Sequence, residues 1–117
     1  MIGFNNVKNL YVVTGVTDLR KGIDGYAAII KTQLGHEPTD HSMYLFCNRD
    51  HTKLKCLYYD GTGFWLLYKR LDHGHFKWKV SENQVSVIIS EQQLRWLLEG
   101  LKMEQKSAFK NVEKAFC

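Results

Sequence analysis

The chain has few cysteines, no long apolar run and no segment of biased composition. Its three cysteines form no close pairs, which favours reduced thiols and a cytoplasmic location over a disulfide scaffold. No apolar stretch approaches the ~20 residues of a membrane-spanning helix. The first residues show no cationic leader followed by a long apolar core. We therefore expect a protein that is neither membrane-bound nor secreted.

The bulk composition is that of one globular domain. The 117 residues are 44% apolar and 24% charged, without repeats or linkers. A chain of this length buries roughly two-thirds of its unfolded surface without disulfides or metals. We predict a single domain over residues 1–117, with a core at about 8–101 and a C-terminal helical tail at 102–117.

The net charge of +4 is concentrated in residues 53–79. This stretch holds six Lys or Arg residues against two Asp, whereas residues 1–52 and 80–117 each balance five basic groups with five acidic ones. It also holds seven of the fifteen aromatic residues. Cations interleaved with rings suit a nucleic-acid surface, because phosphates bind cations and bases stack on rings. The same pattern also suits a packed antiparallel sheet with lysines along its edges.

The first part of the chain predicts one strand and one helix. Residues 10–13 have strand character. Thr17 and Asp18 are good N-cap residues for a helix from about Arg20 to Leu34, in which apolar side chains recur at intervals of three and four. Gly35 is the expected end of this helix.

From residue 43 onward the apolar period changes to two, which is typical of strands. Asp60-Gly61 predicts a two-residue hairpin turn, and residues 72–74 predict a longer one, so a meander of about four antiparallel strands is expected. The predicted strands are residues 43–47, 54–59, 62–70 and 75–80, followed by 85–89.

The last part of the chain predicts helices. Ser90 stands three residues before Gln93, a capping-box spacing that opens a helix over residues 91–99 with Gly100 as its stop. Helical spacing resumes in the tail. The expected fold is therefore α+β: an antiparallel sheet of about four to six strands, packed with one N-terminal helix and one or two C-terminal helices.

Nucleic-acid binding on the sheet is the first functional hypothesis. Alternation places Lys53 and Lys55 on one face of their strand, and Trp65 and Lys69 together on the next strand. If the register joins these two sets, they form a cationic and half-aromatic platform. Arg70 and Lys77 complete the expected contacts on the basic stretch.

The start of the first helix offers a second set of contacts. Arg20 and Lys21 suit phosphate, because helix N-termini and basic side chains both attract anions. The alternative is that Arg20 pairs with Asp18 or Asp24 and only shapes the turn. The complete predicted nucleic-acid-binding set is Lys53, Lys55, Trp65, Lys69, Arg70, Lys77, Arg20 and Lys21.

Enzymatic and metal-binding functions are less well supported by the sequence. A nuclease needs carboxylates gathered around a divalent metal, but the available ones all occupy turn or cap positions: Asp18, Asp24, Asp50 and Asp60. A zinc site also lacks the tight spacing of structural knuckles; its candidate ligands are Cys47, His51, Cys56 and either His73 or His75. We expect no catalytic residue, no metal and no cofactor.

Protein–protein interaction is the alternative function. The helix over residues 91–99 has more apolar surface than one face needs, since Trp96 and Leu98 point partly away from the stripe of Leu94, Leu97 and Leu101. This helix, or the amphipathic tail, would dock a partner protein or a second copy of the chain without binding nucleic acid.

Several motifs follow one another along residues 10–100: residues 17–25 (TDLRKGIDG), 45–49 (LFCNR), 53–61 (KLKCLYYDG), 63–65 (GFW), 68–71 (YKRL) and 74–78 (GHFKW). In this order they resemble a known family, the small accessory protein of IS-sixty-six-type bacterial insertion sequences, often labelled TnpB and distinct from the RNA-guided nuclease of that label. The resemblance implies a non-enzymatic role in DNA transposition beside a separate transposase, which becomes an expected partner together with nucleic acid, in the first place DNA, and a homo-oligomer as a further option.

Overall fold

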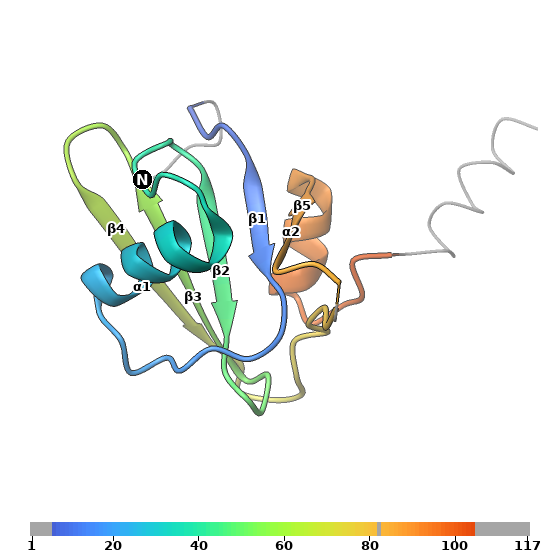
Figure 1. The fold of residues 1–117 in the computed structure, drawn as a ribbon. Helices are drawn as coiled ribbons and strands as arrows, with labels where there is room; N and C mark the ends of the chain where they lie inside the picture. The colour runs from blue at the N-terminus through green and yellow to red at the C-terminus, as the bar shows by residue number, and fades with distance from the viewer. Residues whose placement is uncertain (1–5, 82, 105–117) are drawn as a thin grey trace, which may run out of the picture.

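The computed structural model describes residues 6–81 and 83–104. Its centre is a five-stranded sheet with the strand order β4-β3-β2-β1-β5. Figure 1 shows this sheet with α1 in front of it and α2 on the other side. The elements in chain order are β1 (Leu10–Val13), α1 (Ile23–Ile29), the short π-helical segment η1 (Ile30–Leu34), β2 (Met43–Cys47), β3 (Lys53–Tyr59), β4 (Phe64–Arg70), β5 (Ser86–Ile89) and α2 (Glu91–Leu98).

The sheet is mostly antiparallel, with one parallel pair. β2, β3 and β4 form a meander, and β5 returns antiparallel to β1. β1 and β2 are parallel, with Leu10 opposite Met43, because α1 and η1 form the crossover between them. The α+β class is therefore confirmed. The first helix follows a strand instead of leading the chain.

Each face of the sheet has its own apolar cluster. On the α1 face, Tyr26 and Ile30 pack against Tyr44, Phe46 and Leu57. The α2 face packs the buried leucines of α2 against alternate residues of four strands, together with two aromatic side chains from the segment after β4. That second cluster is made of Leu10, Val12, Met43, Leu45, Cys47, Leu54, Cys56, Tyr58, Phe76, Trp78, Ile89, Leu94 and Leu97.

The predicted start of the first helix is wrong. The helix begins at Ile23 with Gly22 at the N-cap position and no side-chain cap. Asp18 lies four residues before this N-cap, and its carboxylate accepts instead from the backbone N–H and the guanidinium of Arg20. Residues 14–22 are therefore an irregular loop at the end of β1.

The predicted strand at residues 75–80 is also absent. Its alternation is real, since Phe76 and Trp78 are buried and Lys77 is exposed. The segment lies on the α2 face of the sheet, held by Phe76 N–H donating to His51 O (2.7 Å) and by the Trp78 indole donating to Val13 O (3.0 Å). A period of two thus arises here from one-sided burial without strand pairing, and the meander has three strands.

The hairpin between β3 and β4 has a longer loop than the two residues predicted. Tyr59 pairs with Phe64, so residues 60–63 form the loop, and Asp60 N–H donates to Gly63 O. Other predictions are confirmed: β1 and β2 at their predicted bounds, the capping box of Ser90 and Gln93, and a left-handed Gly100 after α2 (φ +80°). The predicted tail helix falls largely on residues 105–117, outside the described residues. No helix of the described ranges combines the length and apolar character that a bilayer crossing requires.

Candidate nucleic-acid interface

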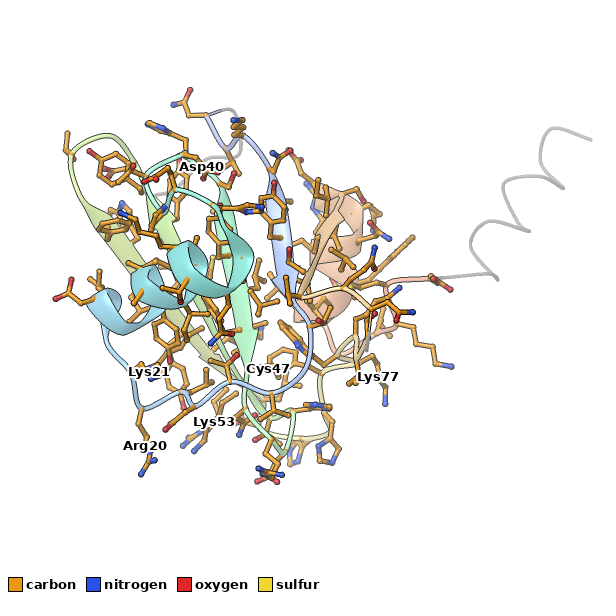
Figure 2. All side chains as sticks on the ribbon, viewed as in Figure 1. Arg20, Lys21, Asp40, Cys47, Lys53 and Lys77 are labelled. Carbon is orange, nitrogen blue, oxygen red and sulfur yellow. The ribbon has the colours of Figure 1, made fainter. Side chains whose placement is uncertain are left out.

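A basic groove lies at one end of the sheet, between the loop that precedes α1 and the paired strands β3 and β4. Figure 2 shows Arg20, Lys21 and Lys53 at this end of the molecule. The groove has a volume of about 960 Å³. It is lined by Val16, Thr17, Asp18, Leu19, Arg20, Asn48, Arg49, Lys53, Lys55, Leu66 and Tyr68.

Strand direction explains why these residues meet. β1, β2 and β4 all end at this edge of the sheet, and β3 begins there. The loop after β1 is tied to the end of β2 by Thr17 N–H donating to Cys47 O (2.9 Å). The loop after β2 is closed by the Asn48 side-chain oxygen, which accepts from the backbone N–H groups of Thr52 and Lys53. Hydrogen-bonded loops therefore carry Arg20 and Arg49, whereas Lys53 and Lys55 belong to β3.

Lys53 and Lys55 form one wall of the groove with residues of β4. Lys53 lies opposite Arg70 and Lys55 lies opposite Tyr68 in the ladder, so all four project from the same face. The Lys55 ammonium is 3.4 Å from Lys21 O and within 6.0 Å of the centre of the Tyr68 ring. This wall thus combines two cations, Lys53 and Lys55, with the ring of Tyr68, which is 55% exposed; Arg70 projects from the same face but does not line the groove.

Arg20 is held by Asp18 and still reaches solvent. Its guanidinium donates to both carboxylate oxygens, with 2.9 Å between Nη2 and Oδ2, and its side chain is 92% exposed. The hydrogen bonds from the Arg20 side chain and backbone lower the pKa of Asp18 to about 2. Asp18 is thus ionised at neutral pH and offsets one positive charge of the groove. Of the two predicted pairings, the one with Asp18 is observed.

The register separates Trp65 and Lys69 from the groove. Tyr58 lies opposite Trp65 and Leu54 opposite Lys69, which places both on the α2 face, away from Lys53 and Lys55. A hairpin loop with an even number of residues pairs odd-numbered with even-numbered positions, so these four odd-numbered residues cannot share a face. The predicted platform of Lys53, Lys55, Trp65 and Lys69 is therefore wrong as a single surface.

Trp65 has a local role in the hairpin. Its indole N–H donates to Asp60 Oδ2 at 2.8 Å, and the other carboxylate oxygen accepts from the backbone N–H groups of Thr62 and Gly63. These bonds, led by the one from Thr62 N–H, hold the pKa of Asp60 well below its usual range. The turn role predicted for Asp60 is thus accompanied by an indole contact.

Lys77 belongs to a second basic hollow, of about 500 Å³, on the other side of the loop that follows β2. Figure 2 shows Lys77 on the opposite flank of this end of the molecule from Arg20. The lining residues are His51, His75, Phe76, Lys77, Trp78, Lys79, Lys102, Met103 and Glu104. Lys77 and the groove residues therefore share one end of the fold without sharing a cavity.

Arg49 and Tyr68 line the groove but are absent from the predicted binding set, and Arg49 is the cation that sequence reasoning missed. It is exposed in the loop after β2 and lines the groove beside Lys53. The available signal was its place at the end of the predicted strand 43–47, where side chains that follow neighbouring strands gather. Because residues 1–52 are neutral as a whole, the charge count did not single it out.

The two thiols in the described part of the chain are unsuited to nucleophilic or metal-binding chemistry at neutral pH. Cys47 and Cys56 are free and buried, and burial raises the pKa of each thiol to about 12. A thiol is a nucleophile or a metal ligand as its thiolate, which is scarce at such a pKa. Within residues 6–81 and 83–104, no group of three or more His, Cys, Asp or Glu side chains is arranged to hold a metal ion.

Comparison with known proteins places the chain in a family. Residues 8–108 match the family described as IS66 Orf2 like protein. Two relatives come from Sinorhizobium fredii (strain NBRC 101917 / NGR234): "Uncharacterized protein y4hO", 36% identical over 92 residues and 79% of each chain, and "Uncharacterized protein y4jC", 32% identical over 76 residues and 65% of each chain. No solved structure matches. With most of its length covered by the match, the chain belongs to the IS66 Orf2 like family, whose members are associated with transposition.

Proposed function

We propose that this protein is a non-enzymatic accessory factor of DNA transposition that binds nucleic acid through the basic groove and acts with the transposase of the same element. The observation that carries the proposal is the convergence of Arg20, Arg49, Lys53 and Lys55 on one groove from three separate segments. Asp18 is the one acidic residue among those that line it. A phosphate backbone is the ligand that such a set of cations suits best.

The groove also carries apolar and aromatic surface beside its cations. Leu66 and Tyr68 of β4 line it next to Lys53 and Lys55. Exposed rings beside cations favour nucleic acid over a free small anion, because bases stack where phosphates are neutralised. DNA is the expected ligand, since the family is associated with transposition. A cytoplasmic location, where such DNA lies, is part of the proposal.

Fluorescence anisotropy with duplex DNA, single-stranded DNA and RNA across a salt series tests the proposal. If roughly four phosphates are engaged, log affinity should fall with log salt with a slope near −3 to −4. The double variant Lys53→Ala/Lys55→Ala should lose affinity and flatten the slope by about 2. Lys69→Ala/Lys77→Ala is the matched control, because it removes the same charge outside the groove.

An equal loss of affinity in the two double variants would show that the charges act only through the overall positive potential of the protein. The groove would then be rejected as the binding surface. No binding by the wild type at low salt would reject nucleic acid as the ligand altogether.

A protein-interaction module is the second candidate function. It is favoured by an apolar groove of about 260 Å³ between β4 and α2, beside the exposed Leu67. In this alternative the apolar groove between β4 and α2 receives an apolar segment of the transposase. Retention of purified transposase by the wild type and its loss in Leu67→Asp would support it, whereas equal retention would count against this groove.

A further inference from the structure

β4 presents a long free edge. It is the outermost strand on its side of the sheet, with β3 as its one neighbour in the described part of the chain. All seven of its residues are at least partly exposed, including Trp65 (45%) and Leu67 (40%). A strand of this length and apolar character at an edge is a template for pairing with another strand.

The backbone groups that point outward can be identified from the hairpin. Asp60 N–H donates to Gly63 O, and Leu71 N–H donates to Thr52 O, both on the same ladder as the β3–β4 pairs. In an antiparallel ladder, bonded and non-bonded pairs alternate. The odd-numbered residues of β4 therefore bond to β3, and the N–H and C=O groups of the even-numbered residues, Phe64 to Arg70, face outward.

A second β4 fits this edge in one register along its full length. Antiparallel pairing centred on Leu67 places Phe64 opposite Arg70 and Leu66 opposite Tyr68 of the second copy. These are the outward-facing residues, so four bonded pairs with two bonds each give about eight new hydrogen bonds. The even-numbered residues of β4, whose N–H and C=O groups the hairpin leaves unused, are thus the residues that must form hydrogen bonds in this register.

The side chains are complementary in the same register. Each charged residue of β4 lies opposite an aromatic ring: Lys69 opposite Trp65, and Arg70 opposite Phe64. Cations over rings are favourable, most of all for tryptophan. Leu67 meets Leu67, and Leu66 meets Tyr68. No like charges face each other, whereas a shift of four residues along the strand would set Lys69 opposite Lys69.

We propose that two copies of this chain form a symmetric dimer by antiparallel pairing of β4 with β4, joining the two sheets into one. The interface is isologous, since each copy contributes the same strand. Lysine and arginine on an edge strand often prevent such pairing. Here both charged residues lie at one end of β4, and residues 64–68 carry no charge, so no lysine or arginine opposes pairing along the central part of the edge.

The dimer would also place two basic grooves on one face. The two-fold axis of an antiparallel strand pair is perpendicular to the sheet, so both α1 faces point the same way. The two Arg70 ends then lie at opposite ends of a strand pair about 20 Å long. A single nucleic acid could contact both grooves. The dimer itself does not depend on nucleic-acid binding.

A disulfide tests the register. In a Cys117→Ser background, Leu67→Cys should form an intermolecular disulfide under mild oxidation, because its symmetry mate lies about 4.5 Å away between Cα atoms. Tyr68→Cys is the matched control: Tyr68 is more exposed than Leu67 (55% against 40%), but its mate is a diagonal neighbour about 7–8 Å away. Cross-linking of Leu67→Cys with little of Tyr68→Cys supports the proposal, and equal cross-linking of both overturns it.

Sedimentation equilibrium of the wild type tests the dimer without any cysteine. Tyr68→Pro removes an outward-facing N–H that β3 does not use, so this variant should keep its circular dichroism spectrum and become monomeric. Tyr68→Ala, which keeps the N–H, should remain largely dimeric. A wild type that is monomeric at every concentration, or a Tyr68→Pro variant that stays dimeric, overturns the proposal.

Discussion

Lys55 lies directly opposite Tyr68 across the β3–β4 ladder, with its ammonium nitrogen 6.0 Å from the centre of the tyrosine ring. The same nitrogen is 5.8 Å from the centre of the ring of Tyr26, the buried tyrosine of α1. The half-buried lysine is thus positioned by two rings and by the Lys21 carbonyl. One wall of the groove therefore offers a positioned cation next to a free aromatic face.

Replacing Tyr68 by Ala should weaken binding to single-stranded DNA about tenfold, because stacking of one base on an aromatic side chain is worth roughly 1–3 kcal/mol. The loss should be smaller for duplex DNA, whose bases are already stacked. Anisotropy titrations at one salt concentration provide the measurement. Tyr68→Phe keeps the ring and should bind like the wild type. Equal losses for Ala and Phe would show that the hydroxyl, and not stacking, matters.

Asp18→Asn should strengthen binding at low salt and steepen the salt slope by up to about 1, because it frees the Arg20 charge for phosphate. The pKa of Asp18 is about 2, so the wild-type carboxylate stays ionised and this gain should be constant from pH 5 to pH 8. Weaker nucleic-acid binding by Asp18→Asn would instead mean that Asp18 positions Arg20 for contact with phosphate. Asp24→Asn, on the exposed first turn of α1, is the matched control.

Local patterns predicted the individual strands well. β1 and β2 have their predicted bounds because each is a short continuous apolar run, LYVV or MYLFC, with polar residues on both sides. The parallel pairing of Leu10 with Met43 had no local signal, since it joins segments 33 positions apart through a crossover helix. Residues 75–80 show the opposite case, a local pattern without a strand. Their alternation arises because Phe76 and Trp78 are buried against the α2 face of the sheet, although the segment pairs with no strand.

The site was predicted in its parts but not in its assembly. Alternation correctly grouped Lys53 with Lys55, and Trp65 with Lys69. Whether the two groups share a face depends on whether the hairpin loop has an odd or an even number of residues. The two-residue loop predicted and the four-residue loop observed are both even and place the groups on opposite faces, so the predicted turn already excluded the joint platform. The union of Arg20 with Lys53 and Lys55 depends on tertiary contacts such as the bond from Thr17 N–H to Cys47 O.

Trp78→Phe should lower the free energy of unfolding by about 1–3 kcal/mol, because it leaves the Val13 carbonyl without the indole donor in a buried setting. Trp65→Phe is the control, since it also removes an indole hydrogen bond, the one to Asp60, but on an exposed hairpin. Its cost should stay below about 1 kcal/mol. Urea unfolding curves of both variants give the comparison. A similar cost for both would contradict the role of burial.

Ser90→Ala should lower the free energy of unfolding by about 1 kcal/mol, because the hydroxyl accepts from Gln93 N–H in the capping box of α2. α2 holds Leu94 and Leu97 on the sheet, so weaker capping acts on the core of the α2 face. Ser90→Asp keeps an acceptor at the N-cap and should retain most of the stability. Urea unfolding measures both variants, and an unchanged midpoint for Ser90→Ala would rule out a stabilising cap.

The buried thiols predict a loss of stability at alkaline pH. Burial raises the pKa of Cys47 and Cys56 to about 12, against about 8.5 in an unfolded chain. Between these values the unfolded state has lost protons that the folded state retains, so the free energy of unfolding falls as pH rises. In a Cys117→Ser background, urea midpoints at pH 7 and pH 10 measure this decline. Cys47→Ala/Cys56→Ala should flatten it, and rapid reaction of the folded protein with an aromatic disulfide reagent at pH 8 would contradict the burial on which it depends.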